Sequence, residues 1–142
     1  MKTKDFDSRE PVVQEDGLGC AVASTAFVLN IPYQEAITLF EDGQRRAKGI
    51  PNFYCPEIVK ILKEKGLDYS WTKLTDENKG LAEKEMAIVF CKQSSQLPFG
   101  HFLSRVKNGW MDPWINLPNP QRTAGFRENL PGNPTYVVYP NE

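Results

Sequence analysis

The sequence predicts one α+β domain in which helices come first along the chain and a small antiparallel sheet follows. Residues 20–29 form an apolar run whose only polar side chains are those of Ser24 and Thr25. A helix with so little polar surface is typical of the middle of a domain. Residues 55–65 have the spacing of an amphipathic helix, and residues 107–109 (KNG) are a hairpin signal between two strand-like segments.

The chain is expected to begin with an extended lead-in over residues 1–12 and a short strand at residues 11–13. Gly17 and Gly19 then give the backbone the freedom that a tight approach to a helix start requires. The central helix at residues 20–29 follows them directly. We therefore expect the turn and the helix to form one structural unit.

Two further helices are predicted before the sheet. A second helix is expected over residues 33–47, where apolar side chains recur on one face. The third begins with Cys55 at the N-cap and Pro56 at the first helical position, where the fixed φ of proline suits a helix and its missing N–H is not needed. Residues 65–66 (KG) end this helix.

The second half of the chain is predicted to supply the strands, separated by a polar loop or short helix at residues 74–85. Residues 118–142 are rich in proline, asparagine and glycine, and we expect them to be a mostly irregular C-terminal extension of the single domain, residues 1–142. The predicted strands are residues 67–71, 87–91, 101–106, 110–112 and 135–139.

The composition excludes two classes of partner. The net charge of the 142 residues is −1, with basic and acidic side chains mixed along the chain, so neither a nucleic-acid footprint nor an anionic-membrane anchor is indicated. No apolar run approaches the length of a membrane span, and residues 1–10 are charged and lack the apolar core of a signal peptide. A cytoplasmic location is expected, with export by a dedicated secretion route left open.

The cysteine and histidine counts limit the chemistry. Cys20, Cys55 and Cys91 are an odd number of widely spaced thiols, which argues against a disulfide framework and for a reducing compartment. With a single histidine and no CxxC pair, a zinc site of the usual kind is hard to assemble, and we expect neither a metal nor a cofactor. Any imidazole chemistry must use His101.

Four residues together fit the requirements of acyl transfer by cysteine, which needs a thiolate, a base, a group that orients the base, and donors for the oxyanion. Cys20 opens the buried helix, where the positive end of the helix dipole favours the thiolate. His101 starts a strand, and the hairpin brings Asp112 back beside it. Gln14 and the Cys20 backbone N–H would bind the oxyanion. The alternative is that Cys20 is an ordinary small core residue.

These stretches resemble the motifs of papain-like cysteine peptidases, and among them most of all those of the bacteriocin-leader-processing peptidases and their single-domain relatives. Residues 14–24 (QEDGLGCAVAS) are similar to the nucleophile motif, residues 100–106 (GHFLSRV) to the histidine strand, and residues 112–114 (DPW) to the Asp-Pro segment that follows. Residues 49–67 resemble the helix between these motifs. The likeness covers roughly residues 13–117 and keeps the chain order of the family.

The resemblance implies a papain-like fold and a cysteine hydrolase that cleaves a peptide or amide bond through a thioester intermediate, with Cys20, His101 and Asp112 as its triad. Gly19, Trp114 and Phe99 are expected at the substrate groove, where Trp114 either shields the histidine–aspartate bond from water or simply packs on the sheet.

Three other functions stay open at this point. The same triad serves protein glutamine deamidases and transamidases of toxin or effector type, an inactive binding module could keep the fold, and a structural domain could carry the motif by coincidence. The expected partner is a peptide or protein substrate, and an inhibitor or immunity protein is a further partner class.

Overall fold

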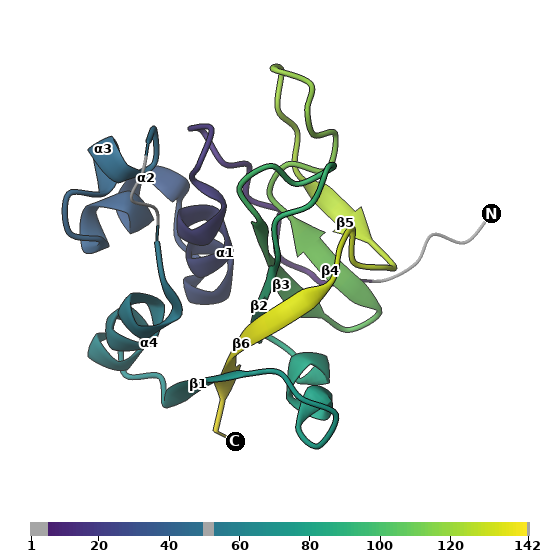
Figure 1. The fold of residues 1–142 in the computed structure, drawn as a ribbon. Helices are drawn as coiled ribbons and strands as arrows, with labels where there is room; N and C mark the ends of the chain where they lie inside the picture. Colours follow the sequence, from purple (N-terminus) through teal and green to yellow (C-terminus); the bar gives the residue numbers. More distant parts are fainter. Residues whose placement is uncertain (1–5, 50–52, 142) are drawn as a thin grey trace.

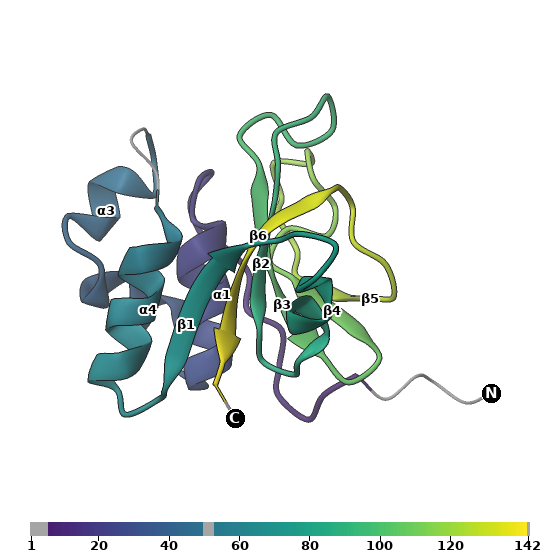
Figure 2. The same cartoon turned by 60° about the horizontal axis from the view of Figure 1, so that its bottom comes forward.

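The computed structural model describes residues 6–49 and 53–141, and it has a mixed architecture of helices packed on an antiparallel sheet. Figures 1 and 2 show helices α1, α2, α3 and α4 gathered on one side of the sheet. The α+β class predicted from the sequence is therefore confirmed. The helical elements are α1 (Cys20–Leu29), α2 (Tyr33–Ala36), the 3-10 helix η1 (Ile37–Leu39), α3 (Gly43–Arg46), α4 (Cys55–Glu64) and the 3-10 helix η2 (Lys79–Glu83).

The sheet has six strands in the order β1-β6-β2-β3-β4-β5, and every neighbouring pair is antiparallel. The predicted strands at 87–91, 101–106 and 110–112 are confirmed as β2, β3 and β4, and the strand predicted at 67–71 lies two residues later as β1. The strands are β1 (Tyr69–Lys73), β2 (Ile88–Cys91), β3 (His101–Val106), β4 (Gly109–Asp112), β5 (Gly125–Arg127) and β6 (Pro134–Pro140).

Helix α1 has the bounds that the apolar run predicts, and every residue from Cys20 to Val28 is buried. It packs against β3 and also contacts α2 and α4, so it is covered from several sides. Arg9 of the lead-in donates from Nη1 to the carbonyl oxygens of Phe27 and Val28, both at 3.0 Å, which satisfies the C-terminal end of the helix. The short strand predicted at residues 11–13 is wrong, because this segment is irregular.

The helix predicted over residues 33–47 is also wrong, because the structure divides it into α2, η1 and α3. Phe40 has extended backbone angles and turns its ring inward, where it lies 4.9 Å from the ring of Phe53. Asp42 then adopts a left-handed conformation with φ of 55°. Burial of an aromatic ring thus outweighs the continuity of the helix.

Helix α4 is confirmed with a shift of one position at its start. Tyr54 is the N-cap, so Cys55 is the first helical residue and Pro56 the second. Glu57 in the first turn forms an ion pair with Arg46 at 2.7 Å, which ties α4 to α3.

Residues 118–142, predicted to be an irregular extension, are the part of the fold that departs most from its prediction. Only its first part is a loop: β5 forms one edge of the sheet, and the long strand β6 lies inside it, between β1 and β2. The strand predicted at 135–139 is confirmed within β6. Both faces of this strand are covered, since Val138 packs with the helices and Val137 packs on the opposite face with η2.

Among the residues that the structure describes, no helix is long and apolar enough to cross a membrane, and no cluster of His, Cys, Asp and Glu side chains could hold a metal ion.

Gly100, immediately before β3, generates a prediction about how His101 is placed. Its φ is +75°, and an added Cβ would lie 2.2 Å from Cζ of Phe90 and 3.0 Å from the carbonyl oxygen of Cys91. Gly100→Ala should therefore lower the free energy of unfolding by about 1–3 kcal/mol, as measured by urea denaturation.

Gly80→Ala is the matched control, because an added Cβ there meets nothing within 4 Å and its φ is not positive. Its free energy of unfolding should stay within about 0.5 kcal/mol of the wild-type value. Equal effects of the two substitutions would show that the strand can start without a left-handed residue.

Candidate active site

Three buried side chains from three elements form the candidate site. Cys20 is the first residue of α1, His101 the first residue of β3, and Asp112 the last residue of β4. Their exposed fractions are 5%, 2% and 1%. The β3–β4 hairpin brings His101 and Asp112 together, and the packing of α1 on β3 carries Cys20 to them.

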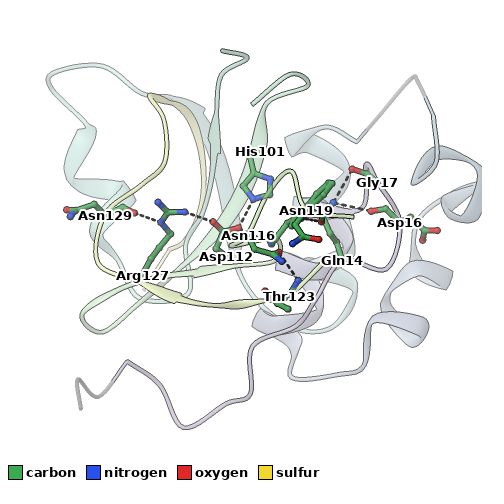
Figure 3. A network of polar contacts seen from close by, with 11 residues as sticks. Gln14, Asp16, Gly17, His101, Asp112, Asn116, Asn119, Thr123, Arg127 and Asn129 are labelled. Atoms are coloured by element: carbon green, nitrogen blue, oxygen red, sulfur yellow. Dashed lines mark hydrogen bonds and ion pairs between the residues drawn. The ribbon is translucent and has the colours of Figure 1, made fainter. Parts of the chain in front are cut away.

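The carboxylate of Asp112 accepts hydrogen bonds on both of its oxygens. Oδ1 lies 2.7 Å from Nε2 of His101 (Figure 3). It also accepts from the backbone N–H of Trp114 at 3.0 Å. Oδ2 accepts from Nη1 of Arg127 at 3.0 Å. Burial alone would raise the pKa of Asp112, but the hydrogen bond and charge of His101, with smaller effects of Trp114 and Arg127, lower the pKa below its ordinary value.

The imidazole of His101 lies between the carboxylate and the thiol. Burial alone would lower the pKa of His101, but the bond to Asp112, followed by the hydrogen bond and charge of Cys20, raises this pKa to about 10. Because Asp112 occupies Nε2, the other ring nitrogen is the one left for Cys20. This raised pKa favours the protonated ring at neutral pH, with the carboxylate of Asp112 on one side and Cys20 on the other.

Cys20 stands where backbone donors are available to an anion. It is the first residue of α1, and the first N–H groups of a helix have no acceptor inside the helix. The N-cap residue is Gly19, which has no side chain to cap them. The turn before α1 thus leaves this end of the helix open toward the thiol.

Gln14 lies in that turn and is almost fully buried, with an exposed fraction of 1%. Its backbone N–H donates to the carbonyl of Pro113 at 3.2 Å, which joins the turn to the residue after Asp112. Its side-chain Nε2 donates to the carbonyls of Asp16 and Gly17 at 3.0 and 3.1 Å (Figure 3). Oε1 has no hydrogen-bond partner among the described residues.

Gly19 has a packing role that the sequence did not reveal. An added Cβ there would lie 2.1 Å from the hydroxyl oxygen of Tyr33. That hydroxyl donates to Oδ2 of Asp16 at 2.9 Å, and burial, followed by this bond, raises the pKa of Tyr33 far above its ordinary range. A side chain at position 19 would displace the tyrosine that holds the turn.

The two aromatic residues predicted at the groove lie in different settings. Trp114 lines a pocket of about 330 Å³ together with His101, Asp112 and Arg127, and its indole N–H donates to the carbonyl of Asn119 at 2.9 Å. Phe99 is 59% exposed, in the loop just before β3. Trp114 is therefore joined to the histidine–aspartate pair, whereas Phe99 presents its ring to solvent.

Arg127 is the site residue that sequence reasoning missed. It lies on β5, inside the segment expected to be irregular, and no local pattern pairs it with Asp112. Only the pairing of β5 with β4, in which Gly125 is opposite Asp112, brings the arginine within reach. The signal was therefore non-local.

The other two thiols differ from Cys20, because neither contributes to the raised pKa of His101. Cys55 and Cys91 are buried, and burial raises their pKa values to about 11 and about 12. This agrees with a structural role for both. Cys91 lies opposite His101 in the pairing of β2 with β3, but Cys20 is the cysteine whose hydrogen bond and charge raise the pKa of His101.

No protein-family model matches the sequence, and no curated protein does so. Among solved structures, the chain is similar to a double glycine motif protease from an AMS/PCAT transporter, crystallised in complex with the leader peptide. The two chains share 14% identity, the match covers 98% of this chain and 96% of the other, and the TM-score is 0.51. At this identity the likeness shows the fold alone: helices packed on an antiparallel sheet, similar to the fold of that protease.

Proposed function

We propose that the protein is a cysteine peptidase in which Cys20 is the nucleophile, His101 the general acid and base, and Asp112 the residue that orients the imidazole. The observation that carries the proposal is the buried His101–Asp112 pair at 2.7 Å with Cys20 on the other side of the ring. The similarity in fold to a double glycine motif protease supports it. The reaction needs no cofactor.

In the first step the Cys20 thiolate attacks the carbonyl carbon of the scissile amide, which forms a carbon–sulfur bond and places a negative charge on the carbonyl oxygen. As this intermediate collapses, the His101 imidazolium gives its proton to the nitrogen of the leaving amine, and the carbon–nitrogen bond breaks. A thioester remains on Cys20. The neutral imidazole then takes a proton from water as that water attacks the thioester, and collapse of the intermediate releases the acid and restores the Cys20 thiolate beside the imidazolium.

The oxyanion would be bound by the backbone N–H of Cys20 and by the side-chain amide of Gln14. In the free protein the Gln14 amide nitrogen donates to two carbonyls of its own turn. At least one of these bonds must be exchanged for a bond to the oxyanion when the substrate is present. Gln14 would therefore act only in the reacting complex.

A peptide is the proposed substrate, with Gly19, Trp114 and Phe99 at the groove. Because the similar structure holds a leader peptide, peptides with a double glycine motif are the first to test. Intact-mass analysis after incubation distinguishes cleavage, which gives two fragments, from glutamine deamidation, which leaves the peptide whole and changes its mass only slightly.

Selective alkylation tests whether Cys20 and His101 form a reactive pair. Cys55 is a built-in control, because both thiols begin a ten-residue helix and their exposed fractions are 5% and 7%. At pH ~6, iodoacetamide should modify Cys20 far faster than Cys55, because only Cys20 has an imidazolium beside it. The selectivity should fall as the pH rises toward 10, where His101 loses its proton. Mass-spectrometric peptide mapping over time gives the rates.

Alkylation of the His101→Ala variant tests whether the reactivity of Cys20 depends on the imidazole. Without the imidazolium, the rate at Cys20 should approach that at Cys55. If Cys20 reacts equally fast in this variant, or is inert in the wild type, the two residues are not a catalytic pair.

Gln14→Ala separates a catalytic donor from a residue that only holds the turn. Losing one oxyanion donor should lower kcat for a cleaved peptide by about 10²–10³. Alkylation of Cys20 should keep its wild-type rate, because that reaction forms no oxyanion. A parallel loss of turnover and alkylation would mean that Gln14 acts only by holding the turn before Cys20.

A further inference from the structure

The buried carboxylate of Asp112 has a partner that a Cys-His-Asp triad does not include. His101 and the Trp114 N–H bind Oδ1, and Oδ2 is bound by Nη1 of Arg127 at 3.0 Å. Among the described residues, Arg127 is the only side chain that binds Oδ2. Without Arg127, one oxygen of a fully buried carboxylate would lose its hydrogen bond.

The structure holds Arg127 firmly in this position. Arg127 is opposite Trp110 in the pairing of β5 with β4, and Trp110 is two residues before Asp112 on the same face of the sheet. The guanidinium is further fixed by a bond of 2.8 Å from Nε to the carbonyl of Asn129 (Figure 3). The long side chain thus reaches diagonally from one strand to the carboxylate on the next.

The charges around Asp112 give this contact a function. The cations that face the carboxylate are His101 on β3 and Arg127 on β5. Cys20 on α1 interacts with His101, and the charge of Asp112 contributes to the raised pKa of Cys91 on β2. The thiol of Cys91 stays protonated at neutral pH, because burial raises its pKa to about 12. When His101 gives its proton away, Arg127 is the cation that remains beside the carboxylate.

We propose that Arg127 is a positioning residue of the site, which holds Oδ2 of Asp112 and keeps this carboxylate ionised while His101 gains and loses its proton. The proposal rests on the proposed catalytic role of His101. It gives the C-terminal segment a positioning role in a site whose other members come from earlier in the chain.

His101 makes the test sharp, because it is the only histidine in the sequence. Its ring signals in an NMR titration of ¹⁵N-histidine-labelled protein can therefore be assigned without ambiguity. Protonation of Asp112 removes the negative charge beside Nε2 of His101, so the chemical shifts of the ring should change in a step at acid pH. In the wild type this step is expected below 3.8, the ordinary value, because the pKa of Asp112 is lowered.

Arg127→Met keeps the length of the stem but removes the charge and the donors. The acid-side step should then rise by about one pH unit or more, because an opposite charge in contact with the carboxylate has been lost. Arg127→Lys, which keeps the charge but not the fork of donors, should give a smaller rise. If Arg127→Met does not fold, the proposal is tested by the smaller rise in the pH of this step in Arg127→Lys.

Arg105→Met is the matched control. Arg105 lies on β3, opposite the same Trp110 from the other side, and pairs with Glu83 instead of Asp112. It should leave the step unchanged. A step that does not move in the Arg127 variants, or that moves equally in Arg105→Met, would overturn the proposal.

The outcomes also separate this proposal from the peptidase proposal. A step that moves in a protein whose Cys20 is inert would support the role of Arg127 and remove the peptidase. If Cys20 is reactive but the titration step does not move in the Arg127 variants, the peptidase proposal is supported and the role of Arg127 is removed.

Discussion

Asp112 carries a negative charge at a position that is 1% exposed, and a buried carboxylate is tolerated only when its charge and hydrogen bonds are matched. Here the match comes from three parts of the chain: the imidazole of His101, the backbone N–H of Trp114 and the guanidinium of Arg127. Each of these groups favours the ionised form of the carboxylate. The raised pKa of His101, and with it the proposed chemistry of Cys20, depends on that ionised carboxylate.

The order of the strands explains how distant residues meet at this carboxylate. Strands β3, β4 and β5 are neighbours in the sheet, so His101, Asp112 and Arg127 lie on successive strands. Strand β6, from the end of the chain, lies between β1 and β2 and joins the part of the sheet next to α4 to the part that carries the site. The C-terminal segment thus contributes two strands to the sheet and Arg127 to the contacts of Asp112.

The elements that could be predicted from the sequence are those with local signals. The apolar run of α1, the start of β3 at His101 and the hairpin before Asp112 each follow from a few adjacent residues. The break at Phe40 could not be predicted in this way, because it depends on the distant ring of Phe53. Arg127 was missed for the same reason, since its contact with Asp112 exists only through the pairing of β5 with β4. The location of the protein in the cell and the identity of its substrate stay predictions.

The coupling between Cys20 and His101 can be measured from the side of the histidine. Because the thiol contributes to the raised pKa of His101, removing it in Cys20→Ala must lower that pKa, just as linkage requires of any two interacting groups. An NMR titration of the single histidine in both proteins gives the comparison directly. A His101 pKa that is well above its ordinary value of 6.5 in the wild type and clearly lower in Cys20→Ala is the predicted result. The same pKa in both proteins would contradict a catalytic Cys20–His101 pair.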